Sequence, residues 1–308
     1  MNPLEHGLAE YLTLRHSLGY KLERAGQLLA DFVAFAAASG AEHLTTDLAL
    51  SWAVRSSNPQ SGWRAQRLGA VRCFARYLHA VDPLHEVPPT RLLPPGQGRP
   101  APLLYSPEQV AALMTAARRL ASPLRAATLE TVIGLLAVTG LRVGELMALD
   151  IDDVEFDTGL LVVKTSKTNR SRLVALHESS LDALRAYLAE RERLVPPDRG
   201  RSLFVSTAGT RLSSGGLGAA FAEVVALAGL AASRDGKRPR LGGFRHSFAV
   251  QRLLNWHEDG RDVQAMLPVL SCFLGHVSPA STYWYLSASP ELLAAAARRV
   301  ERTLGLRP

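Results

Sequence analysis

Cysteine is scarce in this chain, which has only Cys73 and Cys272 among its 308 residues. The two lie far apart and no Cys-x-x-Cys spacing occurs, so the sequence predicts neither a disulfide framework nor a zinc site. No apolar run approaches the roughly 18 residues that a membrane-spanning helix requires. The first thirty residues mix charged and apolar positions, unlike a signal peptide. We expect a soluble, cytoplasmic protein with reduced, packed thiols and no metal.

Positive charge is what the chain has in excess. Its 35 lysines and arginines outnumber its 28 acidic residues, which gives a net charge of +7 and a pI near 9.8. This balance favours a polyanionic partner, although a solubility margin or a membrane-surface protein would also fit it. A hydrophobic content of 47% supports real cores, and 308 residues exceed the usual size of one core. Two domains are therefore expected.

A segment rich in proline and glycine divides the chain. It contains the string VPPTRLLPPGQGRPAP, a composition that suits an extended connector and cannot form the interior of a helix or strand. We predict an N-terminal domain over residues 1–90, a linker over 91–102 and a larger second domain over 103–308.

Apolar residues recur at helical spacing before the linker and predict a small bundle of four short helices. The last of these helices carries four arginines beside Trp63 and Tyr77, namely Arg64, Arg67, Arg72 and Arg76. Such spacing would let cationic side chains line one flank against a DNA phosphate backbone. A merely solvated helix face is the alternative.

The second domain is predicted to be mainly helical with a small antiparallel sheet. Ser106 followed by Pro107 is typical of a helix start, and a second helix over 123–138 should end at Gly140. Strand-forming segments separated by turns predict a three-stranded meander, over 151–156, 160–165 and 172–176. Helices are expected again from Ser179 onward.

Five separated residues in this domain have the chemistry to act on a phosphodiester: Arg142, Lys167, Arg245, His276 and Tyr285. A tyrosine hydroxyl can attack the phosphorus directly if cations neutralise the charge that builds on its oxygens and an acid protonates the departing oxygen. Each arginine is expected at a helix start, where backbone amides also favour an anion. No metal ion is required for this chemistry.

In this order the motifs resemble the tyrosine recombinases of the phage-integrase and Xer type, whose signature runs Arg, Lys, His-x-x-Arg, Gly-His, Tyr. The likeness extends over about residues 4 to 300. It implies a SAM-like N-terminal domain that binds core DNA and a catalytic domain with a C-terminal oligomerisation helix. It also implies site-specific recombination through a 3′-phosphotyrosyl intermediate, in DNA integration or transposition, without a cofactor. The implied partners are double-stranded DNA and a homotetramer on it, or partner recombinases.

The resemblance also implies a role for individual residues. Tyr285 is the expected nucleophile, in preference to Tyr283, because its spacing from His276 matches that of the family. Arg142, Arg245 and His276 would stabilise the charge at phosphorus. Lys167 would protonate the leaving 5′ oxygen, with Lys164 as the fallback candidate. Around this set we expect Glu145 to hold Arg142 and two further arginines of the hairpin to contact DNA, Arg170 and Arg172.

One position departs from the family signature. A histidine is expected three residues before Arg245, where this chain has Gly242. Glycine cannot bond to a phosphate or accept the tyrosine proton, so reduced or altered catalysis is one interpretation. His246 follows Arg245 directly, and we expect it to point another way along the helix and not to replace the missing histidine. The segment between Arg245 and His276 is longer than in compact Xer proteins, which suggests a transposon-associated branch.

Three other classes of protein share some of these features. A type IB topoisomerase uses similar chemistry but swivels DNA. A non-catalytic DNA-binding regulator with an inherited fold would explain Gly242 and the basic charge equally well. A metal-dependent nuclease is disfavoured, because the acidic residues Asp150, Asp152 and Asp153 fall on an apparent turn and not beside the arginine and tyrosine positions.

Overall fold

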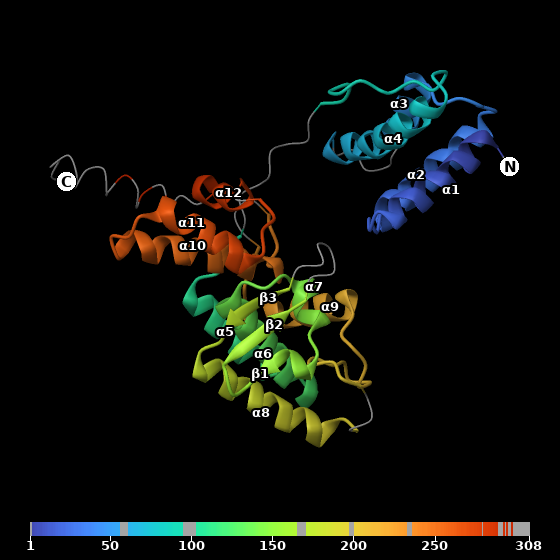
Figure 1. Ribbon diagram of the computed structural model, residues 1–308. Helices are drawn as coiled ribbons and strands as arrows, with labels where there is room; N and C mark the ends of the chain where they lie inside the picture. Colours follow the sequence, from blue (N-terminus) through green and yellow to red (C-terminus); the bar gives the residue numbers. More distant parts are fainter. Residues whose placement is uncertain are drawn as a thin grey trace. The chain divides into compact units, whose positions relative to one another are not determined.

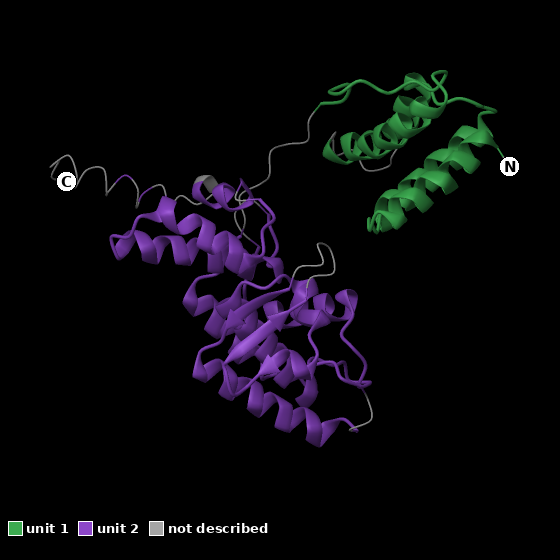
Figure 2. Cartoon of the chain, in the orientation of Figure 1, with its two compact units in different colours: residues 1–100 green, residues 101–308 purple. Residues whose placement is uncertain are grey.

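The computed structural model describes residues 2–55, 61–94, 103–164, 171–196, 200–232, 236–278 and 280–288, together with residues 292, 294 and 297. The chain divides into two compact units, residues 1–100 and 101–308 (Figure 2). Most of the predicted linker, residues 95–102, lies outside the described residues. Within the described ranges, no helix combines the length and apolarity needed to cross a membrane.

The N-terminal unit is helical, as predicted, and its elements in chain order are α1 (Pro3–Ser17), α2 (Glu23–Ala38), α3 (Thr46–Val54) and α4 (Ser61–Val81). Local capping explains where α1 begins. The Asn2 side chain accepts the N–H of Leu4 at 3.0 Å, the Glu5 carboxylate accepts the N–H of Asn2 at 3.0 Å, and Pro3 occupies the first turn. These contacts satisfy N–H groups that have no partner inside the helix.

Large apolar side chains from all four of these helices meet in one core. Leu4, Phe32, Trp52 and Phe74 come from α1, α2, α3 and α4 and are essentially inaccessible to solvent. The rings of Phe32 and Trp52 pack edge to face with centroids 5.3 Å apart, a favoured aromatic geometry. The helical apolar spacing in the sequence thus corresponds to the buried faces of this bundle.

The larger unit is mainly helical and contains one small sheet (Figure 1). Its elements in chain order are α5 (Pro107–Ala117), α6 (Pro123–Thr139), α7 (Val143–Ala148), the 3₁₀ helix η1 (Ile151–Asp153), β1 (Val154–Glu155), β2 (Leu160–Val163), β3 (Arg172–Ala175), α8 (Glu178–Leu194), α9 (Ser214–Leu227), α10 (Gly242–Glu258), α11 (Val263–Leu274) and α12 (Ala280–Ala288). The predicted fold class, mainly α with a small antiparallel sheet, is confirmed.

The sheet has the order β1-β2-β3, with both pairs antiparallel and Leu161 opposite Val174. The prediction of a strand over 151–156 was wrong for most of its length. The Asp153 carboxylate accepts the N–H of Asp150 at 2.9 Å, and the Asp150 side chain caps the turn in return. This reciprocal cap favours a 3₁₀ turn over Ile151–Asp153 and leaves only two residues for the strand.

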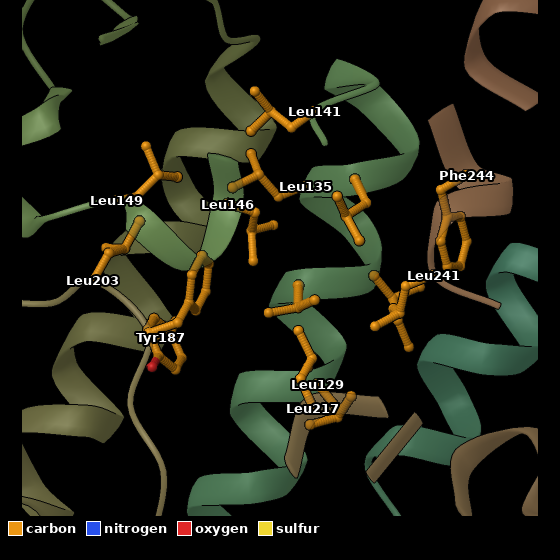
Figure 3. Close-up of a cluster of buried hydrophobic side chains, with 14 of the residues drawn as sticks. Leu129, Leu135, Leu141, Leu146, Leu149, Tyr187, Leu203, Leu217, Leu241 and Phe244 are labelled. Carbon is orange, nitrogen blue, oxygen red and sulfur yellow. The ribbon is translucent and has the colours of Figure 1, made fainter. Parts of the chain in front are cut away.

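Helix α6 is the central helix of the larger unit and contacts α5, α7, α8, α9 and α10. Its buried residues include Leu129, Ile133, Leu135 and Leu136, which lie on more than one side of the helix, as expected of an element enclosed by others. Figure 3 shows Leu129 and Leu135 in the cluster of leucines and aromatic residues around this helix. A second cluster joins α10, α11 and α12, and Tyr285 belongs to it.

Candidate active site

The turn between α6 and α7 places the first predicted arginine. Gly140 ends α6 with φ 61°, a backbone conformation that favours glycine. A Cβ at this position would lie 2.6 Å from Cδ1 of Phe248 on α10, so glycine also lets the turn approach that helix closely. Two residues later Arg142 is the N-cap of α7, at the helix start that the sequence predicts.

A buried carboxylate holds Arg142. Its Nη1 donates to Glu145 Oε1 at 2.6 Å, and its backbone N–H donates to Oε2 at 3.0 Å. Arg172 of β3 donates to the same carboxylate, through Nη2 to Oε2 at 2.8 Å and through Nη1 to Oε1 at 3.2 Å. Glu145, which is 7% exposed, therefore bridges two guanidinium groups.

The charge of Glu145 is fixed by these contacts. Burial by itself would raise the pKa of its carboxyl, but the hydrogen bonds from Arg172 and Arg142 outweigh burial and lower the pKa to about 2. Glu145 is consequently ionised at neutral pH. A fixed negative charge behind Arg142 keeps the guanidinium oriented, in line with the predicted holding role.

Arg172 requires a correction. The sequence interpretation had it contact DNA, but its side chain is only 12% exposed and its guanidinium is directed inward. Besides the two bonds to Glu145, its Nε donates to the Phe273 carbonyl at 2.9 Å. Arg172 therefore ties β3 to α7 and to the end of α11, and its contacts support a positioning role toward Arg142.

Arg245 is the most enclosed cation of the site. It is 8% exposed, and it donates from Nη1 to the Gly140 carbonyl at 2.8 Å and from Nη2 to the Leu274 carbonyl at 2.6 Å. Burial, and next the positive charge of Arg142, lower its pKa to about 10. It stays charged at neutral pH. The two accepting carbonyls belong to the ends of α6 and α11, so backbone geometry sets its position.

The end of α11 forms the Gly-His turn. Gly275 has φ 66°, and a Cβ there would lie 2.8 Å from Nη1 of Arg172. Its carbonyl accepts a hydrogen bond from Nη2 of Arg142 at 3.1 Å. Glycine is required here on both counts, backbone conformation and close approach. The turn thereby brings His276 beside the arginines.

Hydrogen bonds between side chains orient His276. Its Nδ1 lies 2.7 Å from Oγ1 of Thr282, which lies 2.6 Å from Oγ of Ser271. Thr282 and Ser271 are both buried, so the three groups form a chain from α11 to α12. Since Nδ1 is engaged in this way, any contact of the ring with a phosphate oxygen would use Nε2.

Tyr285 lies on α12 with its ring among other rings. The residue is 3% exposed, whereas Tyr283 on the same helix is 52% exposed. The Tyr285 ring stacks on His276 with centroids 6.2 Å apart and an interplanar angle of 19°. It also contacts Trp284, at 5.4 Å. Tyr285, and not Tyr283, thus lies beside the Gly-His turn.

The structure brings four of the five predicted catalytic residues together: Arg142, Arg245, His276 and Tyr285. The charge of Arg142 and that of an ionised Tyr285 both act on the pKa of Arg245, the first lowering it and the second raising it. The remaining predicted residues of the hairpin, Lys167 and Arg170, lie outside the described residues.

Lys164, the fallback for Lys167, is paired elsewhere. Its Nζ lies 2.5 Å from Oδ1 of Asp153, and this contact raises the pKa of Lys164. The other acidic residues of that turn are also paired with cations, Asp150 with Arg211 and Asp152 with Arg201. These carboxylates thus serve charge pairs around η1.

Sequence reasoning misjudged His246. It was expected to point away from the site, yet its ring centroid lies 5.6 Å from that of Tyr285 and 5.4 Å from that of Trp284. A helical wheel contains the signal that was missed. Gly242 and His246 are four residues apart on α10, and residues at that spacing lie on the same helix face.

The four arginines of α4 do not share one flank. Arg67 and Arg76 are nine residues apart, about two and a half helical turns, so they project to opposite sides. The guanidinium of Arg67 lies over the Trp52 ring, 3.7 Å from its centroid, and donates to the Trp52 carbonyl at 3.1 Å. Arg72 donates to the carbonyls of residues 88 and 89, both at 2.8 Å. Of the four, Arg76 is exposed and the other three are partly buried.

Two neighbouring arginines, a Gly-His turn and a tyrosine, on a helical domain with one small sheet, are the features of a tyrosine-type site-specific DNA recombinase. The chain belongs to the phage integrase family, whose model matches residues 105–291. An integrase/recombinase of Sinorhizobium fredii, y4rB, is 41% identical over 98% of this chain and 98% of its own length. The tyrosine recombinase XerD of Caulobacter vibrioides is 31% identical over 75% of this chain and 72% of its own length.

A solved structure shows the same fold. The integrase of transposon Tn1549, in complex with transposon right-end DNA, matches with a TM-score of 0.71 and 14% identity. The match covers 98% of this chain and 99% of that chain. Membership of the family gives the reaction class: DNA cleavage and rejoining through a 3′-phosphotyrosyl intermediate, in DNA recombination and integration.

Proposed function

We propose that Tyr285 is the nucleophile of this recombinase and that Arg142, Arg245 and His276 bind the scissile phosphate. The observation that carries the proposal is a buried cation, Arg245, beside a second, partly exposed cation, Arg142. Arg245 is 8% exposed, and burial, followed by the nearby positive charge of Arg142, lowers its pKa. Two like charges held together by backbone carbonyls and a carboxylate favour an anion between them, and a phosphodiester supplies that anion.

The reaction follows from these positions. The Tyr285 oxygen forms a bond to phosphorus while the bond to the 5′ oxygen breaks. The negative charge on the nonbridging oxygens is stabilised by the two guanidinium groups, which are already oriented before DNA binds, and by His276. Lys167 supplies the proton to the leaving 5′ oxygen. Since the phosphotyrosyl bond retains the bond energy, a second DNA end can reverse the step without ATP.

The burial of Tyr285 adds a requirement. A residue that is 3% exposed cannot reach a phosphate on the protein surface without movement. We infer that DNA binding shifts α12 so that the phenol turns toward the arginines. Arg64 and Arg76, which keep part of their surface open on α4, would add contacts to the DNA backbone from the N-terminal domain. The protein would act on chromosomal or element DNA in the cytoplasm.

We further propose that the active form is a tetramer on two DNA duplexes, because strand exchange requires two cleaved strands from each of two sites. The predicted oligomerisation segment after residue 288, most of which lies outside the described residues, would supply the contact between protomers. Mass measurement of the protein with and without its DNA site tests this assembly. A monomer or dimer that completes strand exchange would overturn it.

The nucleophile is tested by trapping. Purified protein is mixed with overlapping duplex fragments that tile its own locus, quenched with detergent and assayed for protein-linked DNA. The expected result is an adduct in the native protein and in Tyr283→Phe, and no adduct in Tyr285→Phe. Tyr283 is a matched control because it lies on the same helix. An adduct that survives in Tyr285→Phe would overturn the assignment. Protein that binds DNA but forms no adduct would favour a non-catalytic regulator.

A further inference from the structure

Position 242 has room for a side chain that the chain does not provide. Gly242 is the first residue of α10, and an added Cβ would have no described atom within 4 Å. The adjacent Gly243 differs, because its Cβ would lie 2.7 Å from Cε2 of Tyr105. Close packing therefore requires glycine at 243 but not at 242. The space beside residue 242, where the family signature has histidine, is open.

The side chain of His246 lies close to this open space. It lies one helical turn beyond Gly242, so both residues are on the same face of α10. Helical side chains lean toward the N-terminus of their own helix, and a side chain covers the turn before its own Cα. The His246 side chain is thus directed toward the turn that begins at Gly242, and Arg245 lies between the two in sequence.

The same face of α10 meets the nucleophile. The centroid of the His246 ring is 5.6 Å from that of Tyr285, with an interplanar angle of 56°, and 5.4 Å from that of Trp284. His276, the other imidazole beside Tyr285, has its Nδ1 bonded to Thr282 and stacks nearly parallel to the phenol. Two imidazoles therefore border Tyr285, one held by the α11–α12 hydrogen bonds and one on the helix of Arg245.

We propose that His246 is the proton acceptor for Tyr285, in place of a histidine at position 242. As the Tyr285 oxygen bonds to phosphorus, its O–H bond breaks and the proton passes to the His246 imidazole, while the leaving 5′ oxygen takes a separate proton. On rejoining, the imidazolium returns the proton to the phenolic oxygen. Histidine suits this task because its charge changes between about pH 5 and 8. The proposal rests on Tyr285 being the nucleophile.

Removal of the imidazole with retention of an aromatic ring tests the proposal. His246→Phe should keep the packing against Trp284 and bind DNA as the native protein does. Its single-turnover rate of adduct formation should fall about 100- to 10,000-fold, the usual contribution of a general base. His257→Phe, the same change about three turns further along α10, is the control and should cleave at the native rate.

A variant with the imidazole moved to position 242 distinguishes a role of His246 in proton transfer from a role in packing. The double variant His246→Phe with Gly242→His should regain at least about 10-fold of the lost rate, since the new ring enters the open space on the same face. A purely structural role of His246 would not be restored by a side chain at 242. His246→Gln, which preserves polarity without a basic ring, should be as slow as His246→Phe and provides a second test if the phenylalanine variant is unstable.

The results of these experiments distinguish failure of the proton-acceptor role from failure of the proposed function on which it rests. If Tyr285→Phe abolishes the adduct while His246→Phe and His246→Gln both form it at the native rate, the proton-acceptor role is wrong and the nucleophile stands. If Tyr285→Phe still forms the adduct, or the native protein forms none with any fragment of the locus, the proposed function fails and this inference fails with it.

Discussion

Glu145 and Arg172 form an ion pair with 2.8 Å between Oε2 and Nη2, and this pair connects the sheet to the helix that Arg142 begins. Neither side chain is more than 12% exposed. Arg142 itself is partly open, so its direction depends on the buried pair behind it. The direction of the Arg142 guanidinium is thus set by two largely buried side chains.

Loss of the Glu145 charge should weaken both stability and cleavage. Glu145→Gln leaves the largely buried Arg172 and the partly exposed Arg142 without their carboxylate, and breaking a buried pair costs about 3–5 kcal/mol of unfolding free energy. Denaturant unfolding and the adduct assay measure the two effects. Glu190→Gln is the control, because Glu190 pairs with Arg193 on the surface of α8, where loss of a pair costs about 1 kcal/mol or less. Equal losses of stability and cleavage in both variants would contradict the importance of the Glu145 bridge between Arg142 and Arg172.

The same carboxylate should make the larger unit sensitive to acid. The pKa of Glu145 is lowered from 4.5 to about 2 in the folded protein. Its contribution to stability is therefore complete above pH 4.5 and is lost as the pH falls from 4.5 toward 2. Unfolding free energies measured through this range should decline more steeply in the native protein than in Glu145→Gln. Identical slopes would show that the carboxyl titrates normally in the fold.

Replacement of Gly275 should lower stability for two separate reasons, its backbone conformation and its close approach to Arg172. Gly275→Ala places a residue with a Cβ at φ 66° and puts that atom 2.8 Å from Arg172 Nη1. Gly260→Ala is the matched control, with φ 71° and no described atom within 4 Å of the added Cβ. The control should lose about 1–2 kcal/mol from the backbone conformation alone. Gly275→Ala should lose more and also cleave DNA more slowly, because Arg142 and Arg172 both contact this turn.

The sequence was sufficient where local chemistry decides the structure. Ser106 begins α5 with its hydroxyl 3.3 Å from the N–H of Gln109, and Gly140 ends α6 in the left-handed conformation. Both are short-range signals. The order of the catalytic motifs also predicted which residues would meet, because the family signature encodes a fold that local patterns alone do not reveal.

Side-chain direction is what the sequence left undetermined. In the sequence Arg172 is one more basic residue of a hairpin, and only the folded chain, in which β3 contacts α11, brings it to Glu145, which is 27 residues away in sequence. For Arg67 and His246 the direction follows from the helical repeat of 3.6 residues and is therefore contained in the sequence. Arg67 and Arg76 project to opposite sides of α4, whereas His246 and Gly242 lie on the same face of α10.

His85 should make the N-terminal unit lose stability in mild acid. It is 6% exposed, and its Nδ1 accepts the N–H of Leu44 at 3.0 Å. Burial lowers its pKa, while nearby Asp82 opposes and His43 and His79 reinforce this shift. A lowered pKa means that the unfolded chain binds the proton more readily, so stability is complete above about pH 6.5 and falls below it.

Denaturant unfolding of the native chain at pH 8 and pH 5.5 measures this effect, with fluorescence of the N-terminal tryptophans Trp52 and Trp63 as the probe. His85→Gln, which retains a side-chain acceptor, should show a smaller difference between the two pH values. His16→Gln, a change at an exposed histidine of α1, should behave as the native protein does. An unchanged pH difference in His85→Gln would assign the effect to another group.

Substitution of Lys167 and substitution of Lys164 should have different effects on the cleavage rate, if Lys167 protonates the leaving group. Lys164 is bound to Asp153 with Nζ 2.5 Å from Oδ1, which keeps it at the turn of η1, so Lys164→Met should cleave at close to the native rate. Lys167→Met should be slower by about 100- to 10,000-fold if Lys167 is the general acid.

A substrate with sulfur in place of the scissile 5′ oxygen needs little protonation on departure, because a thiolate is a much weaker base than an alkoxide. It should restore the rate of Lys167→Met and should not restore that of Tyr285→Phe. If Lys164→Met is the variant that the sulfur substrate restores, the acid lies at the end of β2 and its pair with Asp153 must open when DNA binds.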